Sequence, residues 1–199
     1  MHNYIKSQIK ETQRVIAVML SDPVLLNNLR LVANRCIDAF NSGGKILLAG
    51  NGGSAADAQH IAAEFVSRFA FDRPGLPAVA LTVDTSILTA IGNDYGYEKL
   101  FSRQIQAIGN KGDILIAYST SGSSKNILSA LATAHSQEIL TIGLTGNRGG
   151  VMKDYCDYLI EVPSGDTPKI QEGHLILGHI ICGLVENEIF SSYQQKTNE

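Results

Sequence analysis

Short apolar runs alternate with longer segments of helical periodicity along most of the chain, from about residue 45 onward. Each run is bounded by turn-forming residues and is apolar at consecutive positions, so each is predicted to be a strand buried on both faces. The five runs are KILLAG (45–50), PAVALTV (77–83), GDILIAYS (112–119), EILTIGLT (138–145) and DYLIEVP (157–163).

The segments between these runs are predicted to be helices, because their apolar residues recur at intervals of three and four. They cover about 54–70, 85–107 with an interruption near GNDYG, 124–136 and 168–190, with a short turn near 149–154. Strands that alternate with helices predict an α/β fold, with a doubly wound five-stranded parallel sheet and helices on both faces.

Three loops carry most of the polar chemistry, at 50–54, 92–96 and 119–124. All three lie at or near the carboxyl ends of predicted strands. Ligands of doubly wound sheets bind beyond that edge, so these loops are expected to form the ligand site.

Two helices are predicted before the first strand. Apolar residues at near-helical spacing from Ile5 to Leu20 give one stripe on an otherwise polar helix. Asp22 and Pro23 then predict the start of the second helix. Because the later helices already cover the sheet, the pair formed by residues 1–42 is expected to pack against another subunit.

The composition fits one globular domain spanning 1–199, with the α/β core at 45–190. Hydrophobic residues make up 44% and charged residues 18%, and the net charge of −3 gives no global attraction to nucleic acid or an anionic membrane. No secretory signal and no run of ~20 apolar residues is present. Three widely spaced cysteines, Cys36, Cys156 and Cys182, are expected to be small buried residues, and they favour a reducing, cytoplasmic location.

The stretch LLAGNGGSAADAQHIAAE (47–64) places Gly50, Gly52 and Ala55 at the G-x-G-x-x-A spacing of a dinucleotide-binding turn. That fingerprint also needs an acidic residue about 20 positions further on to hold the ribose. The first acid after the second predicted strand is Asp84, 34 positions past Gly50. The spacing therefore argues against a dinucleotide site.

His60 and Glu64 lie four positions apart on the helix after this turn, roughly 6 Å apart along its axis and on one face. Such a pair is also typical of a solvated helix face. The last predicted helix adds Gln171 and His174, and it places His179 within an apolar run. A buried imidazole needs a partner, which is either a backbone carbonyl or a shared ligand.

Two imidazoles with carboxylate and amide oxygens form a ligand set suited to zinc or a similar divalent ion. Gln171 and His179 are eight residues apart, about 12 Å along a straight helix. Sharing one ion would require both side chains to lean toward it, or another subunit to contribute. His174, one turn from Gln171, is the competing ligand, and spacing alone leaves the choice open.

The loop within YSTSGSSKN follows a predicted strand and opens a helix. Five of its six residues from Ser119 to Ser124, here called the serine loop, carry hydroxyl groups. Backbone N–H groups, hydroxyls and a helix N-terminus would together suit a phosphate monoester. The loop lacks the lysine arrangement of a nucleoside triphosphate site. The alternative is a simple turn with a serine N-cap.

Taken in order, the segments GNGGSAADAQHIAAE, RPGLPAVAL, GNDYGYE, STSGSS and IQEGHLILGH resemble the sugar isomerase (SIS) domain family. The resemblance runs from about Lys45 to Glu188, and the two leading helices also fit it. It implies a flavodoxin-like sheet and, more specifically, the members that isomerise heptose phosphates. Their reaction converts D-sedoheptulose 7-phosphate to D-glycero-D-manno-heptose 7-phosphate, the first step of ADP-heptose and lipopolysaccharide core biosynthesis.

The same resemblance implies a homotetramer with active sites at subunit interfaces and one Zn²⁺ per subunit. It assigns proton transfer to Glu64 and His179, and it selects His179 over His174. The implied metal ligands are His60, Glu64, Gln171 and His179. The implied substrate-binding residues are Asn51, Gly52, Gly53, Glu64, Asn93, Asp94, Ser119, Thr120, Ser121, Ser124 and Gln171.

Aldose–ketose isomerisation moves a proton between neighbouring carbons through an enediol, so it needs a base at carbon, an acid at oxygen and stabilisation of the oxyanion. We expect Glu64 to be the base and His179 the acid/base at the oxygens, with a metal polarising the carbonyl. A carboxylate on zinc is a weaker base, so Glu64 either leaves the ion during turnover or the ion is structural. Some relatives carry an aspartate just ahead of the segment that contains Gln171. In this chain the acid, Asp166, lies five positions before Gln171, and no role is assigned to it.

Two alternatives stay open on sequence alone. The family also contains non-catalytic modules that bind a replication initiator or sense a sugar phosphate. The initiator-binding members do not retain Glu and His at the positions of Glu64 and His179, which favours an enzyme here. An isomerase of a different sugar phosphate would use the same residues.

Overall fold

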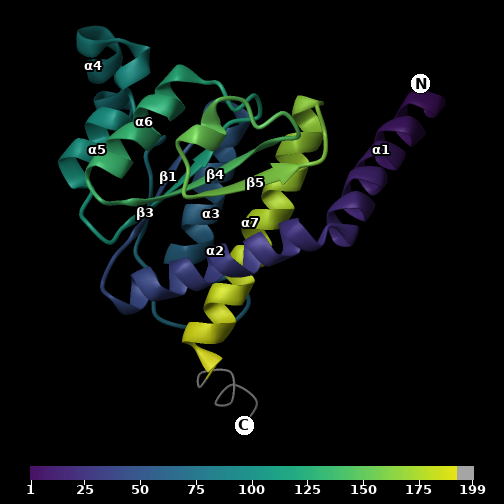
Figure 1. Cartoon of the computed structure of the whole chain (residues 1–199), viewed down its shortest axis with the longest axis horizontal. Coiled ribbons are helices and arrows are strands. Elements are labelled where there is room, and N and C mark those ends of the chain that lie inside the picture. Colours follow the sequence, from purple (N-terminus) through teal and green to yellow (C-terminus); the bar gives the residue numbers. More distant parts are fainter. Residues whose placement is uncertain (192–199) are drawn as a thin grey trace.

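The computed structural model describes residues 1–191, and its elements follow the order that the hydrophobic pattern predicts (Figure 1). The helices are α1 (His2–Ser21), α2 (Pro23–Asn41), α3 (Gly53–Val66), α4 (Thr85–Tyr95), α5 (Ser102–Ile108), α6 (Lys125–Ser136) and α7 (Thr167–Ile189), with 3₁₀ turns η1 (Tyr97–Lys99) and η2 (Met152–Asp154). The strands are β1 (Ile46–Ala49), β2 (Ala78–Ala80), β3 (Ile114–Tyr118), β4 (Leu140–Gly146) and β5 (Tyr158–Val162).

The five strands form one sheet in the order β2-β1-β3-β4-β5, and every neighbouring pair is parallel. Leu48 of β1 lies beside Ala80 of β2 and Ile116 of β3. The chain moves outward from β1 to β2 and then crosses back to β3, so the topological switch point lies between β1 and β3. This confirms the predicted doubly wound, five-stranded parallel sheet.

Alternate strand residues belong to two hydrophobic cores, one on each face of the sheet. Ile46 and Leu48 contribute to the core that contains residues of α1, α2, α3 and α7, whereas Leu47 and Ala49 contribute to the core with α4, α5 and α6. Helices therefore cover both faces, as expected. The edge strand β2 departs from the prediction, because it is only partly buried and its Val79 is exposed.

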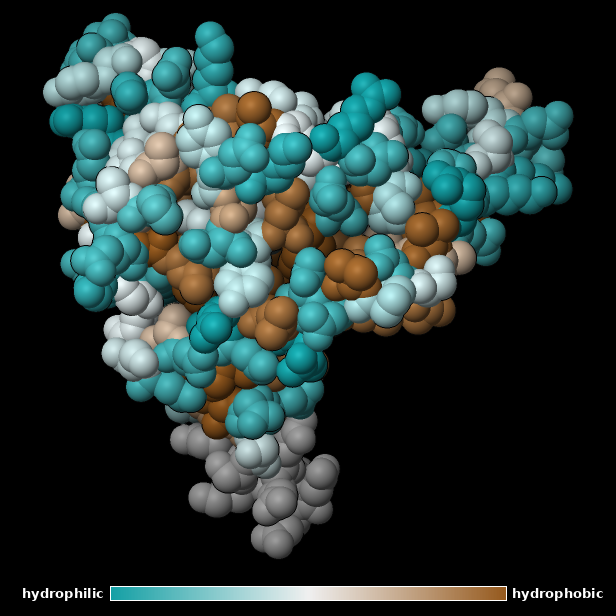
Figure 2. All heavy atoms as spheres, viewed as in Figure 1, coloured by the Kyte–Doolittle hydropathy of each residue, from teal (hydrophilic) through white to brown (hydrophobic). Residues whose placement is uncertain are grey.

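The N-terminal helices join at the predicted position. Asp22 accepts hydrogen bonds from the backbone N–H groups of Val24 and Leu25, and Pro23 occupies the first turn of α2. Much of α1 extends away from the rest of the chain (Figure 1). Exposed apolar residues of the pair include Tyr4, Ile5, Ile9, Ile16, Leu20, Val24 and Leu26. Figure 2 shows apolar side chains near the junction of α1 and α2.

Polar contacts fasten α1 to α7. The Thr12 hydroxyl donates to Glu172 Oε2 at 2.6 Å, and the Lys169 ammonium donates to both of these side chains. Within residues 1–191, no single helix is long and apolar enough to cross a membrane, and α1 and α2 meet those criteria only together, across a 75° bend.

One helix boundary differs clearly from the prediction. The pattern extended the helix after β1 to about residue 70, but α3 ends at Val66. Arg73, from the segment that follows, donates to the carbonyl oxygens of Glu64 and Phe65. Those carbonyls are therefore satisfied by a side chain in place of another helical turn. No Gly or Pro marks the stop between residues 67 and 70, so the pattern alone could not show it.

The three cysteines are free. Cys36 and Cys182 are buried as predicted, whereas Cys156 is only partly buried because it lies in the turn before β5. Burial raises the pKa of the Cys36 thiol to about 12, so this thiol stays protonated at neutral pH.

Candidate active site

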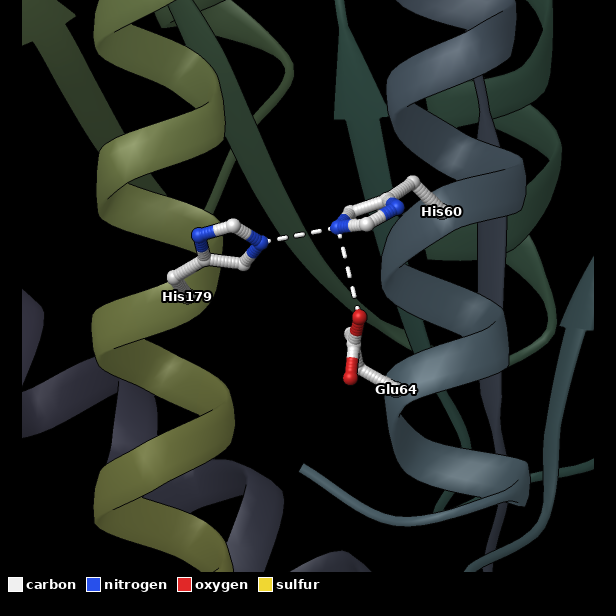
Figure 3. Close-up of side chains that lie close together, drawn as sticks. All are labelled: His60, Glu64 and His179. Atoms are coloured by element: carbon white, nitrogen blue, oxygen red, sulfur yellow. Dashed lines mark hydrogen bonds and ion pairs between the residues drawn. The ribbon is translucent and has the colours of Figure 1, made fainter. Parts of the chain in front are cut away.

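His60, Glu64 and His179 come together between α3 and α7. Figure 3 shows the two imidazole rings reaching toward each other from facing helices, with Glu64 one turn along α3 from His60. His60 Nε2 lies 2.8 Å from His179 Nε2 and 3.3 Å from Glu64 Oε1. The His60 side chain is 45% exposed and that of Glu64 is 22% exposed, so the cluster is accessible from solvent.

The close approach of α3 and α7 depends on Gly178, the residue before His179. A Cβ at position 178 would lie 2.6 Å from Ile61 Cδ1 and 2.9 Å from Ile61 Cγ1, well inside an ordinary carbon–carbon contact. Ile61 is 1% exposed and packed in the core, so it cannot swing aside freely. The glycine thus allows His179 to reach His60.

The cluster fits a divalent metal ion. Its three ligand atoms lie within 4.8 Å of one another, and two nitrogens with a carboxylate oxygen form a set that zinc and similar ions accept. Two nitrogens on one tetrahedral zinc are roughly 3.3 Å apart, given Zn–N bonds of ~2.0 Å. The observed 2.8 Å is about 0.5 Å shorter, which a small rotation of either ring corrects.

Gln171 is not brought to this cluster. Its amide packs against the first turn of α3, where a Cβ on Gly53 would lie 2.6 Å from Gln171 Nε2 and 2.8 Å from Oε1. Gly53 precedes His60 by seven residues, or about 10 Å along α3. The structure therefore places Gln171 at the start of α3, while His60, Glu64 and His179 meet two turns further along.

A hydrogen-bonded amide pair joins the turn after β1 to α6. Asn51 and Asn126 exchange side-chain hydrogen bonds of 2.9 and 2.8 Å, and the Tyr97 hydroxyl donates to Asn51 Oδ1 at 3.0 Å. Asn126 lies in the first turn of α6, so the pair fixes the turn at 50–54 relative to the serine loop. Among the described residues, one Nδ2 hydrogen of Asn51 stays available for a ligand.

The serine loop connects β3 to α6, a helix of 12 residues. Ser119 is 3% exposed and its hydroxyl donates to Ser124 Oγ at 3.2 Å. Thr120 and Ser121 line a cavity of about 230 Å³ whose wall also includes Arg148. Hydroxyls, a helix N-terminus and a nearby cation together provide favourable surroundings for a phosphate group.

The turn at 50–54 borders a second cavity. It measures about 310 Å³ and includes Asn51, Gly52 and Tyr97 in its wall. Asn93 donates to Asp94 Oδ1 at 2.8 Å near the end of α4, and both residues are exposed. Tyr97, two residues after the end of α4, connects this segment to the turn after β1 through its hydrogen bond to Asn51.

Three polar residues near the site were not predicted from the sequence as part of it. Asn126 and Tyr97 both hydrogen bond to Asn51, and the available signal was that they stand within the segments YSTSGSSKN and GNDYGYE. Asp57 lies one turn before His60 on α3, and its Oδ2 is buried without a hydrogen-bond partner within residues 1–191. Burial raises the pKa of its carboxyl to about 6, although His60 opposes this shift.

The structure distinguishes the two histidines of α7. His174 is fully buried, its Nε2 lies 3.3 Å from the Thr145 carbonyl oxygen, and burial lowers its pKa to about 4. It also packs beside the Tyr118 ring, with centroids 5.7 Å apart. His174 is therefore the core histidine bonded to a carbonyl, whereas His179 faces His60.

The chain belongs to the SIS domain family: the model of that domain matches residues 9–146, which is more than half of its length. Within the family it belongs with the phosphoheptose isomerases, and it is therefore an isomerase. It is 71% identical to the phosphoheptose isomerase of Burkholderia pseudomallei (strain K96243) over 187 residues, which cover 94% of this chain and 95% of that protein.

Solved structures of phosphoheptose isomerases share the fold. The one from Neisseria gonorrhoeae aligns with a TM-score of 0.87 at 40% identity, over 94% of this chain and 98% of that chain. The one from Francisella tularensis aligns with a TM-score of 0.89 at 36% identity, over 93% of this chain and 97% of that chain. Both confirm the fold class and the family.

Proposed function

We propose that this protein converts D-sedoheptulose 7-phosphate to D-glycero-D-manno-heptose 7-phosphate, the first step of ADP-heptose and lipopolysaccharide core biosynthesis. The observation that carries the proposal is the convergence of His60, Glu64 and His179 at 2.8 and 3.3 Å in a chain of the phosphoheptose isomerase family. A module that only binds a sugar phosphate does not need a carboxylate and two imidazoles in one accessible cluster.

Glu64 and His179 divide the proton transfers. Glu64 takes a proton from C1 of the ketose while His179 gives one to the C2 oxygen, which forms the enediol. His179 then takes the proton from the C1 oxygen, and Glu64, whose proton can exchange with solvent, delivers one to C2. Because Glu64 Oε1 faces His60, we propose that Oε2 is the oxygen that takes the proton from C1 and gives one to C2.

The residues that would hold Zn²⁺, one ion per subunit, are His60, Glu64 and His179, and Glu64 and His179 would each have to leave the ion at the atom that transfers a proton. Gln171 joins them as a fourth ligand only if its side chain turns away from Gly53 or if another subunit supplies it. When bound, the ion would polarise the substrate oxygens and stabilise the enediolate.

The loops beyond the carboxyl ends of the strands bind the rest of the substrate. In this proposal the serine loop holds the phosphate at the N-terminus of α6. Polar groups around the turn after β1 and the end of α4 bind the sugar. The residues assigned to substrate binding are Asn51, Gly52, Gly53, Glu64, Asn93, Asp94, Ser119, Thr120, Ser121, Ser124 and Gln171.

The N-terminal helices support a proposal for the assembly. We infer one SIS domain across 1–199 with its α/β core at 45–190. The exposed apolar residues of the pair at 1–42 support subunit packing, and we propose a cytoplasmic homotetramer with active sites at its interfaces.

The test is isomerisation in D₂O. The purified protein is mixed with sedoheptulose 7-phosphate, and NMR follows the aldose and the deuterium at its C2. Glu64→Gln and His179→Ala are each expected to lose about 10²–10⁴-fold in rate. The matched control is His135→Ala, an exposed histidine in the last turn of α6, which should keep wild-type activity.

Each outcome bears on a separate part of the proposal. No heptose 7-phosphate from the wild-type protein refutes the function, and full activity in Glu64→Gln removes that residue as the base. Incubation with a chelator is expected to reduce the rate, and added Zn²⁺ to restore it. An unchanged rate in protein shown by elemental analysis to be metal-free refutes the metal role alone.

A further inference from the structure

A buried arginine binds the end of the helix that carries His60 and Glu64. Arg73 lies in the segment between α3 and β2, and its side chain is 1% exposed. Its Nη2 donates to the Glu64 carbonyl oxygen at 2.8 Å, and its Nη1 donates to the Phe65 carbonyl oxygen at 2.6 Å. A cation at a helix C-terminus also interacts favourably with the helix dipole.

The partner of this arginine comes from α7. Glu186 is 1% exposed, and its Oε1 accepts from Arg73 Nε at 2.9 Å. The same carboxylate accepts from the backbone N–H groups of Phe69 and Ala70 at 2.8 and 2.6 Å. Charge and hydrogen-bonding capacity are both largely satisfied, which a buried ion pair requires.

Both ends of this network reach the candidate active site. Arg73 binds the backbone of Glu64 itself. Glu186 binds the backbone of Phe69, whose ring packs against the His179 imidazole with centroids 5.6 Å apart. Glu186 also lies on α7, seven residues after His179, so the pair links the two helices that supply the cluster.

We propose that Arg73 and Glu186 are positioning residues for the His60–Glu64–His179 cluster. The pair fixes the last turn of α3 and holds Phe69 against His179. These contacts determine the positions of the Glu64 carboxylate and the His179 imidazole. Mutation of residues that orient metal ligands without binding the metal themselves typically lowers metal affinity or activity by about 10–100-fold. This inference rests on the proposed function of the cluster.

Two variants test it. Glu186→Gln removes one charge but keeps the side-chain shape. The double variant Arg73→Met with Glu186→Met replaces the buried pair by apolar side chains, an exchange that often leaves stability intact. For both we expect Zn²⁺ affinity, measured by chelator competition, to fall about 10-fold or more, with kcat reduced more than KM is changed.

The matched control is Asp113→Asn, in the residue just before the central strand β3. Asp113 is also a buried carboxylate that binds a cation, Lys45, and accepts from backbone N–H groups, those of Lys45 and Asn110. Its loss should lower the melting temperature without changing Zn²⁺ affinity. A third readout is amide hydrogen exchange of the metal-free protein, which should accelerate at residues 64–70 in both Arg73–Glu186 variants.

The outcomes separate this inference from the proposed function. A wild-type protein that neither binds Zn²⁺ nor isomerises the substrate contradicts the proposed function. An active wild-type protein whose Glu186→Gln and double variants keep its Zn²⁺ affinity and kcat overturns the positioning role. That role is also overturned if Asp113→Asn, at an equal loss of melting temperature, loses as much Zn²⁺ affinity as the Arg73–Glu186 variants do.

Discussion

Replacing Gly178 by alanine should separate α3 from α7 and weaken the metal cluster. The added Cβ would meet Ile61 Cδ1 at 2.6 Å, whereas carbon atoms in contact sit at about 3.5–4.0 Å. Relief of this overlap requires a movement of about 1 Å, and Ile61 is packed in the core. If the helices take up that movement, the 2.8 Å distance between the His60 and His179 nitrogens grows toward ~3.8 Å. Both rings must then lean toward each other across the wider gap to reach the roughly 3.3 Å of two nitrogens on one zinc, which works against metal binding.

The free energy of unfolding should change little in Gly178→Ala. Overpacking of a core costs typically 1–3 kcal/mol, about 2 kcal/mol as a central value. Alanine in place of glycine within a helix returns about 1 kcal/mol. The net loss is therefore about 1 kcal/mol, so Gly178→Ala should remain folded while its Zn²⁺ affinity falls about 10-fold or more.

Chelator competition and urea unfolding measure the two effects on the same samples. The double variant Gly178→Ala with Ile61→Ala removes both close atoms and should recover much of the Zn²⁺ affinity, despite the cavity it creates. Wild-type Zn²⁺ affinity in Gly178→Ala would refute the reasoning, since the helix separation would then not control the cluster. An equal loss in the double variant would show that Ile61 is not the obstacle.

Two further predictions concern single side chains. His174 has its pKa lowered from 6.5 to about 4, so the stability it contributes is complete above pH 6.5 and is lost as the pH falls toward 4, because the unfolded chain then binds a proton that the folded chain does not. We expect the free energy of unfolding to fall by up to about 3 kcal/mol through this residue. In His174→Gln, whose amide can still donate to the Thr145 carbonyl oxygen, the free energy of unfolding measured with urea should depend less on pH. Equal pH dependence in the two proteins would contradict this. Tyr97→Phe removes a donor to Asn51 but leaves Asn126 in place, so steady-state kinetics should show KM for the sugar phosphate raised about 2–10-fold with kcat nearly unchanged, and an unaltered KM would exclude the contact from substrate binding.

The fold could be predicted because local signals agree with the global arrangement. The run KILLAG contains Ile46 and Leu48 for one core and Leu47 and Ala49 for the other, so it reads as a strand buried on both faces. Asp22 caps α2 as its sequence context indicates. The interruption near GNDYG also appears, because the chain leaves α4 at Tyr95 and forms η1 before α5.

Features that depend on distant residues could not be predicted. The end of α3 depends on Arg73, which binds carbonyls that a longer helix would have used. Periodicity left His174 and His179 equivalent, because only the packing of α7 decides which faces the sheet and which faces α3. The position of Gln171 against Gly53 likewise depends on how two helices align.

The side-by-side course of α3 and α7 has a consequence for the layout of the site. Gly53 and Gln171 meet near the loop end of the site, and His60 and His179 meet two turns further along both helices. The separation between these meeting points, about 10–12 Å, is set by helical rise. In the proposed function, the two helices therefore fix how far the start of α3, where Gln171 lies, stands from the residues that transfer protons. Loop substitutions would then tune affinity without changing this distance, because the spacing of residues within each helix sets it.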